Sequence, residues 1–341
     1  MASRTPRHWQ FWVGPQCTVA DVLIGLGVAG VLLAVVFALR SEHGQPPGAV
    51  SGGSGTPQDP YRIATCVELQ NVGNFPEAAY VLLRDIDCAE SAEWNEGAGF
   101  FPLGFYDFGF SGSFDGAGHE ISHLLIRRPS TDYQGLFGKL NVGSEVRDLT
   151  LDGDIQGNES VGGLVGWAVG GTITNVTVHG SVRGRTGVGG VAGVNQALMF
   201  NAHSTALVEG TNKWTGGLVG WNYKRAVIDG SSATGPVTGG EFVGGLVGVS
   251  HGAAIIKSYA SGNVQGDEGV GGLVGYVVGS DDGRSSTVAT CYASGDVRGK
   301  KDVGDLVGKV DAGGTVMGSF TQQEGGKAVP FVSSLSTANT Q

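Results

Sequence analysis

The hydrophobic pattern divides the chain into one continuous apolar run near its start and a long region of short alternating segments. The run extends from Val22 to Leu39 and contains no charged side chain. At 1.5 Å per residue, such a run spans about 27 Å, close to the ~30 Å apolar thickness of a bilayer. We therefore predict a transmembrane helix at residues 19–40, preceded by a cytoplasmic segment at residues 1–18.

The residues that flank this run predict its orientation. Trp9, Phe11 and Trp12 are expected to anchor the chain at the membrane interface, because aromatic rings concentrate there. Arginines ahead of the run favour a cytoplasmic N-terminus. A cleaved signal peptide ending near residue 38 is the alternative, although signal cores are usually shorter. Both interpretations export the rest of the chain.

Small residues recur at every fourth position of the predicted helix, at Gly30, Ala34 and Ala38. Such a face lets transmembrane backbones approach closely, so it predicts packing against integral membrane partners. Small residues are also frequent in transmembrane helices in general, which leaves a neutral interpretation open. After the helix, residues 41–59 have the Gly, Pro and Ser content of an extended linker.

Beyond residue 130, a six-residue pattern returns at a nearly constant interval. It reads Val-Gly-Gly-Leu-Val-Gly at residues 161–166, and the copies begin at Tyr133, Val161, Val188, Thr215, Val243, Val270 and Val303. The intervals are about 27 or 28 residues, and the last is lengthened by an insertion near residues 280–286. Each copy continues with two short alternating segments, such as residues 172–178 and 180–184, which are typical of strands.

A coil of this length cannot bury its own apolar side, so the copies must stack on one another. The pattern predicts an all-β parallel solenoid of about seven ~27-residue coils at residues 114–320, rising roughly 30–35 Å at ~4.8 Å per coil. A leucine-rich repeat would need a Leu/Asn consensus that is absent, and a propeller blade needs about 40 residues.

The repeat resembles the GLUG-motif repeat of bacterial exported and surface proteins. The likeness lies in the hexapeptide and in the Tyr-Ala-Ser-Gly-Asn-Val-x-Gly stretch at residues 259–266, and the upstream segments at residues 59–63, 80–87 and 112–121 are similar to the same proteins. It extends over about residues 59–320 and implies a right-handed parallel β-helix. It also implies an adhesin-like role or an appendage of large surface peptidases, and it supplies no catalytic residue.

Composition agrees with a repetitive exported protein and excludes other classes. Glycine accounts for 62 of 341 residues and recurs at the repeat period, while 11 prolines are too few for collagen. The formal net charge is −10. Because no basic cluster opposes this charge, we predict no nucleic-acid partner.

Residues 60–113 are rich in aromatic side chains and are predicted to cap the N-terminal end of the solenoid. The alternative is a ligand or partner surface formed by these rings. Cys66 and Cys88 lie in this segment, and a disulfide between them would stabilise it by about 3 kcal/mol. Cys291 aligns with Val176 and Ser258 of other copies, so we expect it inside the stack. The polar tail at residues 321–341 is expected to wrap the last coil, bind a partner or remain unfolded.

No cluster of residues indicates catalysis or metal binding. The carboxylate pairs Asp85/Asp87 and Asp152/Asp154 each lie on one strand face, but two carboxylates alone do not specify a glycosidase or lyase. His119 and His123 lack a third ligand, and residues 281–283 lack the repeated Asp pattern of a calcium β-roll. We therefore predict no catalytic residue, no metal and no cofactor.

These observations favour a non-enzymatic accessory subunit in the bacterial inner membrane, with the solenoid in the periplasm or outside the cell. Its partners would be the lipid bilayer and the integral membrane proteins of a photosynthetic, respiratory or secretory complex. A surface adhesin that binds a glycan or a host surface is the alternative hypothesis. A polysaccharide-degrading enzyme is a third, which the acidic character of the exported part disfavours.

Overall fold

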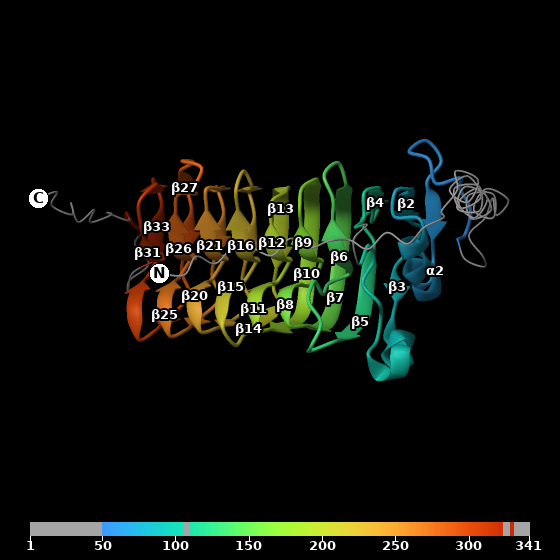
Figure 1. The fold of residues 1–341 in the computed structure, drawn as a ribbon, viewed down its shortest axis with the longest axis horizontal. Helices are drawn as coiled ribbons and strands as arrows, with labels where there is room; N and C mark the ends of the chain where they lie inside the picture. The colour runs from blue at the N-terminus through green and yellow to red at the C-terminus, as the bar shows by residue number, and fades with distance from the viewer. Residues whose placement is uncertain (1–49, 106–108, 323–327, 331–341) are drawn as a thin grey trace, which may run out of the picture. The chain divides into compact units, whose positions relative to one another are not determined.

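The computed structural model describes residues 50–105, 109–322 and 328–330, and these form a parallel β-solenoid of right-handed type with about seven turns. Its coils stack in a row along the long axis (Figure 1). The predicted fold is thus confirmed for this part of the chain. The predicted membrane helix at residues 19–40, its face at Gly30, Ala34 and Ala38, and the anchors Trp9, Phe11 and Trp12 lie outside the described residues. In the described ranges, no helix is long and apolar enough to cross a membrane.

Three parallel sheets form the sides of the solenoid in the described part of the chain. Two are ladders with one strand from each coil. The six-stranded sheet contains β8 (Glu159–Gly162), β11 (Thr186–Gly189), β15 (Lys213–Gly216), β20 (Glu241–Gly244), β25 (Glu268–Gly271) and β30 (Lys301–Gly304). The seven-stranded sheet contains β6 (Phe137–Leu140), β9 (Val165–Ala168), β12 (Ala192–Asn195), β16 (Val219–Tyr223), β21 (Val247–His251), β26 (Val274–Val278) and β31 (Val307–Val310).

The third sheet is the longest and holds the rest of each coil. Its first strands are β1 (Tyr61–Ile63), β2 (Ala79–Leu82), β3 (Ile86–Asp87), β4 (Ser113–Asp115), β5 (Glu120–Arg127), β7 (Glu145–Gln156), β10 (Thr172–Gly184), β13 (Leu198–Ser204) and β14 (Leu207–Gly210). Later coils contribute β17 (Val227–Asp229), β18 (Ser232–Ala233), β19 (Val237–Thr238), β22 (Ala254–Ile256), β23 (Tyr259–Ala260), β24 (Val264–Gln265), β27 (Ser286–Ala289), β28 (Tyr292–Ala293), β29 (Val297–Arg298), β32 (Gly314–Met317) and β33 (Phe320–Gln322). At its end, β34 (Ala328–Pro330) pairs antiparallel with β33.

The segment predicted as a cap, residues 60–113, combines helical turns with the first strands of the long sheet. Strand β1 already pairs in parallel with β2, and β2 pairs with β4. The helical turns are α2 (Cys66–Asn71), η1 (Val72–Asn74), η2 (Ala89–Glu93) and η3 (Asn95–Gly97). Helix α2 is capped by Thr65, because the Glu68 amide donates to Thr65 Oγ1 at 3.2 Å, and the Glu68 carboxylate accepts from the amide of Ala64, the residue before the cap, at 2.6 Å.

The hexapeptide of each repeat forms a corner between two sheets. Strand β8 ends at Gly162, and β9 begins at Val165 on a different sheet. The chain turns between them, where glycine leaves room for the backbone of the same and the next coil. The first copy is one residue shorter at this corner, since Gln134 pairs with Val161 whereas Phe137 pairs with Val165.

Identical side chains stack inside the solenoid from coil to coil. The fourth residue of each hexapeptide lies in the interior: Leu164, Leu218, Leu246, Leu273 and Leu306 are all fully buried, as is Val191 in the copy that lacks leucine. Two buried amides also stack, because the Asn195 Nδ2 donates to Asn222 Oδ1 at 3.0 Å. Each coil thereby supplies the contacts that the next coil lacks.

Cys291 occupies the interior position expected for it. It follows Ser258 in the stack and is 1% exposed, and its thiol donates to the Ala289 carbonyl at 3.2 Å. Burial raises the pKa of the Cys291 thiol to about 11. The thiolate is therefore scarce at neutral and mildly alkaline pH.

We expect the native chain to resist thiol alkylation at Cys291. In the folded protein at pH 8, iodoacetamide should modify Cys291 at least tenfold more slowly than in guanidinium-unfolded protein, because only the thiolate reacts and the side chain is enclosed. Mass spectrometry of labelled peptides measures both rates. Equal rates in folded and unfolded protein would contradict the buried assignment.

Candidate functional site

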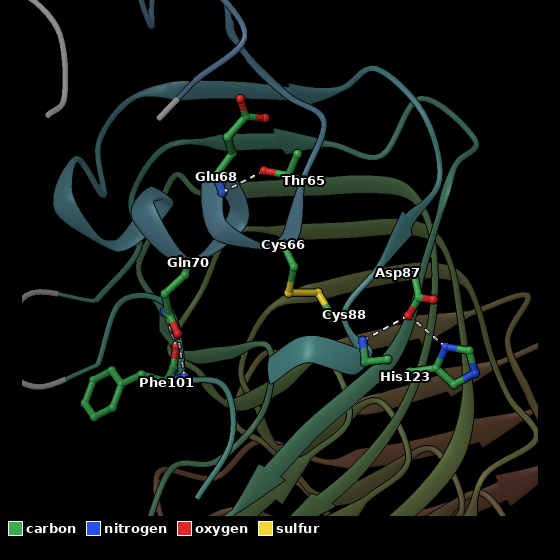
Figure 2. Close-up of a disulfide and its surroundings, with 9 residues drawn as sticks. Thr65, Cys66, Glu68, Gln70, Asp87, Cys88, Phe101 and His123 are labelled. Carbon is green, nitrogen blue, oxygen red and sulfur yellow. Dashed lines mark hydrogen bonds and ion pairs between the residues drawn. A yellow bond between two sulfur atoms is a disulfide. The ribbon is translucent and has the colours of Figure 1, made fainter. Parts of the chain in front are cut away.

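Cys66 and Cys88 form a disulfide that ties helix α2 to the segment after β3 (Figure 2). Their Cα atoms are 5.2 Å apart, and both residues are buried. The pair closes a 22-residue separation at the end of the solenoid where the first strands have few stacking neighbours. It therefore links helix α2 covalently to the segment that follows β3.

Three aromatic side chains of residues 60–113 do not form the exposed surface that the alternative interpretation required. Tyr80, Phe100 and Phe110 are at most 2% exposed and belong to the core. Gln70 fixes the neighbouring loop, because its amide donates to the Phe101 carbonyl at 2.9 Å and accepts from the Phe101 amide at 2.8 Å (Figure 2). These three rings are thus unsuited to ligand contact. Tyr106 and Phe108 lie outside the described residues.

The first carboxylate pair meets the two histidines that the sequence analysis considered separately. Asp85 lies 3.1 Å from His119 Nδ1, and Asp87 lies 2.9 Å from His123 Nδ1. The backbone amide of Glu120 is the largest cause of the lowered pKa of Asp85, and the amide of Ala89 has this role for Asp87. Both carboxylates are exposed and paired locally, so they brace β3 against β5.

The second carboxylate pair is divided between different partners. Asp154 accepts from Arg183 Nη1 at 2.8 Å, while Asp152 stands next to His179 in the β7–β10 register. Across the described ranges, no group of three or more His, Cys, Asp and Glu side chains is placed to hold a metal ion.

A site that the sequence analysis missed lies on the outer side of the six- and seven-stranded sheets. It is a cleft of about 260 Å³, called here the aromatic cleft, and its lining is contributed by three consecutive coils. The lining residues are Trp214, Trp221, Phe242, Val249, His251, Tyr276, Val278, Gly279 and Asp281.

The walls of the aromatic cleft are two pairs of packed rings. Trp214 and Trp221 belong to one coil, and their ring centroids are 4.7 Å apart. Phe242 and Tyr276 come from the next two coils and stack at 4.9 Å with an interplanar angle of 23°. Val249 lies between the walls and is 4% exposed, so it forms the floor.

Stacking explains why these side chains meet. Trp221, Val249 and Tyr276 are in direct register on β16, β21 and β26, so they project from the same position of successive coils. Phe242 leans toward the following coil, since an added Cβ on Gly269 would lie 2.6 Å from Phe242 Cδ1. The space outside Val249 is therefore not filled by a ring and stays open between the two walls.

Two wall residues adopt a backbone conformation that bulky side chains avoid. Trp214 has φ 65° and Phe242 has φ 57°, in the left-handed region, whereas Gly187 and Gly269 occupy the same position in the coils on either side. A bulky residue at positive φ is unfavourable. The same position is left-handed in other coils too, at Tyr133, Ser160 and Asp302, so this conformation belongs to the repeat, and the cleft differs by carrying two large rings there.

The polar groups of the aromatic cleft stand at its rim. His251 lies at the end of β21, with its ring 6.3 Å from that of Trp221. Asp281 is exposed and lies in the insertion that lengthens this repeat. Tyr276 donates to Asp311 at 2.7 Å, and burial together with this bond raises the pKa of Tyr276 to about 12. Its hydroxyl therefore stays neutral and directed away toward Asp311.

A sequence signal for this site exists at the two positions that flank each hexapeptide. The residue that follows it is Lys139, Trp167, Val194, Trp221, Val249, Tyr276 and Lys309 in successive copies. Large rings alternate with valine from Trp167 to Tyr276. The residue before the hexapeptide is aromatic at Trp214 and Phe242, and Tyr133 takes the same place in the first copy because Gln134 pairs with Val161. The recurring glycines and apolar residues of the hexapeptide indicate the core, while the variable flanking positions form the outer surface.

Comparison with known protein families identifies the type of repeat. The GLUG motif family matches residues 157–183, which cover the end of one coil and most of the next, from β8 into β10. This chain carries the GLUG motif within a parallel β-solenoid. The resemblance inferred from the hexapeptide and from residues 259–266 is thereby confirmed.

Two relatives match part of this chain. Halomucin of Haloquadratum walsbyi is 38% identical over 201 residues, which are 56% of this chain and 2% of halomucin. A protein of Evansella cellulosilytica named "Putative Gly-rich membrane protein" is 37% identical over 142 residues, 41% of this chain and 16% of that protein. The chain thus matches only a small part of either relative.

A solved structure shares the fold of the GLUG solenoid. The crystal structure of "a putative immunoglobulin A1 protease from Bacteroides ovatus" superposes with a TM-score of 0.62 over 79% of this chain and 89% of that chain. Sequence identity is 22%, so the likeness concerns the β-solenoid architecture alone.

Proposed function

We propose that this GLUG-motif chain is a non-enzymatic, membrane-anchored β-solenoid that is exported and serves as a rigid accessory subunit of a membrane protein complex. The predicted helix at residues 19–40 would hold it in the bilayer. The solenoid would stand on the outer side and pack on integral membrane partners.

The observation that carries this proposal is that carboxylate and amide side chains of the solenoid are bonded to side chains on neighbouring strands. Asp85, Asp87 and Asp154 are paired with neighbours on adjacent strands, and the buried Asn195 and Asn222 bond each other. Such contacts join successive coils and hold these side chains in place within the solenoid. This supports a structural role in preference to catalysis.

The relatives support a location at the cell surface or membrane. The Evansella protein is named as a membrane protein, and halomucin is named as a mucin. The hydrophobic run at residues 22–39 agrees with such a location on physical grounds, because it matches the thickness of a bilayer.

Purification in mild detergent tests this function. The tagged full chain, extracted from native membranes after brief crosslinking, is expected to bring down integral membrane proteins in stoichiometric amounts. A matched variant in which Gly30, Ala34 and Ala38 are replaced by leucine should lose partners held through the helix. Recovery of the chain alone, with or without crosslinker, would contradict an accessory role.

A further inference from the structure

We propose that the aromatic cleft binds a quaternary ammonium group, such as the trimethylammonium end of choline. This goes beyond the structural role proposed above and does not depend on it. The ligand is defined by its chemistry: a cation that is large, weakly hydrated and covered by methyl groups. Such cations bind where several aromatic faces surround them.

The spacing of the coils suits a cation of this size. Trp221 and Tyr276 lie two coils apart, which corresponds to about 9.6 Å at the usual distance between parallel strands. A nitrogen at the level of Val249 would lie one coil spacing, about 4.8 Å along the solenoid axis, from the strands that carry Trp221 and Tyr276. Because Phe242 is stacked on Tyr276 at 4.9 Å, the rings that such a cation would face are Phe242 and the two tryptophans. Val249 provides an apolar floor for the methyl groups.

The same outer surface already accepts ammonium groups of the chain itself. Lys309 Nζ lies 5.0 Å from the centroid of Tyr276, on the ring that forms one wall of the cleft. Lys224 Nζ lies 5.0 Å from Tyr223, and Lys139 Nζ lies 5.5 Å from Trp167. The distance expected for a bound cation in the cleft thus matches contacts that the molecule makes elsewhere along this ladder.

Charge also favours a cation. The chain has a formal net charge of −10, and the side chain that the insertion adds to the cleft is the carboxylate of Asp281. Long-range attraction raises the local concentration of cations and repels anions.

The scarcity of polar groups separates this ligand from a sugar. The side chains with polar atoms in the lining are His251, Asp281, the two indole rings and Tyr276, whose hydroxyl is bonded to Asp311. A pyranose ring would need partners for several hydroxyl groups, and each one left unpaired is unfavourable. A trimethylammonium group needs none. At about 260 Å³ the cleft is also below the usual ~300–1,000 Å³ of drug-sized sites, which fits one compact group.

Tryptophan fluorescence of the full chain tests the proposal, because Trp214 and Trp221 line the cleft. In dodecyl maltoside, choline and tetramethylammonium are expected to change the emission in a saturable way, whereas ammonium chloride at equal ionic strength is not. Neutral oligosaccharides serve as the second comparison. Saturation by an oligosaccharide without any response to choline would overturn the proposal.

Two variants separate binding from folding. Val249→Tyr fills the floor with a side chain that the same ladder position carries at Tyr276, so it should block binding while the solenoid keeps its circular dichroism spectrum and melting temperature. Asp281→Asn should weaken choline binding at least threefold. Trp167→Ala, which removes a ring two coils away, is the matched control and should bind choline normally. Unchanged binding in Val249→Tyr would overturn the assignment.

Vesicles identify the source of the cation. Capture of phosphatidylcholine vesicles but not of phosphatidylglycerol vesicles would assign lipid headgroups as the ligand. Response to free choline without vesicle capture would assign a soluble cation. Both results support the site, and neither depends on recovery of membrane partners, so failure of the proposed function would be recognised separately.

Discussion

Replacing Gly244 by alanine is expected to lower the free energy of unfolding by more than about 4 kcal/mol, a loss seen only for a few severe defects. An added Cβ would lie 2.0 Å from the Val247 carbonyl oxygen and 2.8 Å from both the Gly275 amide nitrogen and the Leu273 carbonyl oxygen. All three atoms are backbone, two of them in the next coil, so no side-chain rotation relieves the clash. Urea unfolding followed by far-UV circular dichroism measures the change.

Gly73→Ala is the matched control for this substitution. A Cβ at Gly73 would meet only Leu103 Cδ2 at 3.9 Å, an ordinary contact. Its stability should be unchanged or slightly raised, because alanine restricts the unfolded chain more than glycine does. A loss of less than 1 kcal/mol for Gly244→Ala, similar to that of the control, would show that the corner tolerates a side chain and would contradict the close approach of successive coils.

The disulfide should provide the second large effect. The double variant Cys66→Ala/Cys88→Ala is expected to lose about 3 kcal/mol of stability, because the unfolded chain regains the freedom of a loop of this length. The effect should be concentrated at the N-terminal end, where α2 is attached through this bond. Limited proteolysis should therefore cut between residues 65 and 90 before the repeats are attacked, and reduction of the unmodified protein should reproduce this pattern.

Cys291→Ser is the control for the loss of a buried sulfur. Serine occupies the same interior position at Ser258 and Ser319, where its hydroxyl donates to a carbonyl two residues earlier. The variant should therefore stay within about 1 kcal/mol of the natural chain. Equal stability of the double variant and the natural chain under oxidising conditions would contradict a stabilising disulfide.

Gly244→Ala and the loss of the disulfide should destabilise different lengths of the chain, because a solenoid is stabilised mainly by contacts between neighbouring coils. A defect at Gly244 disrupts the interface between two central coils and so weakens the cooperative unit on both sides. Loss of the disulfide releases one end, beyond which stacking continues undisturbed from β4 onward. The central substitution should consequently lower the urea midpoint of the entire repeat region, while the terminal one should separate an early transition from the main one.

The sequence predicted the interior positions correctly wherever the same kind of residue recurs from coil to coil. The recurring leucine and valine positions indicated stacking, and Leu164, Leu218 and Leu246 are indeed buried in line. Cys291 was placed in the stack by the same alignment. The glycines of the hexapeptide predicted tight corners, but only the packing of adjacent coils shows that the corner lies inside the hexapeptide, between β8 and β9.

The aromatic cleft and the local ion pairs were not predicted, and the physical reason is a different one: the aromatic positions can be recognised in the sequence, but their arrangement depends on the tertiary structure. Asp85 and His119 are 34 residues apart and meet through the pairing of β3 with β5, which no periodicity encodes. Trp214 and Phe242 adopt left-handed backbone at positions where the neighbouring coils have glycine, and their direction decides whether the cleft is open or filled.

The amino-acid sequence by itself determined that this chain is a stack of about seven similar coils, because a repeat too short to enclose its own apolar side must cover it with its neighbours. Only the tertiary structure decided what the outside of that stack presents. Equal positions of successive coils come within about 4.8 Å of each other, so single substitutions at variable positions combine across coils into a site. The aromatic cleft is the product of three such coils and belongs to none of them alone.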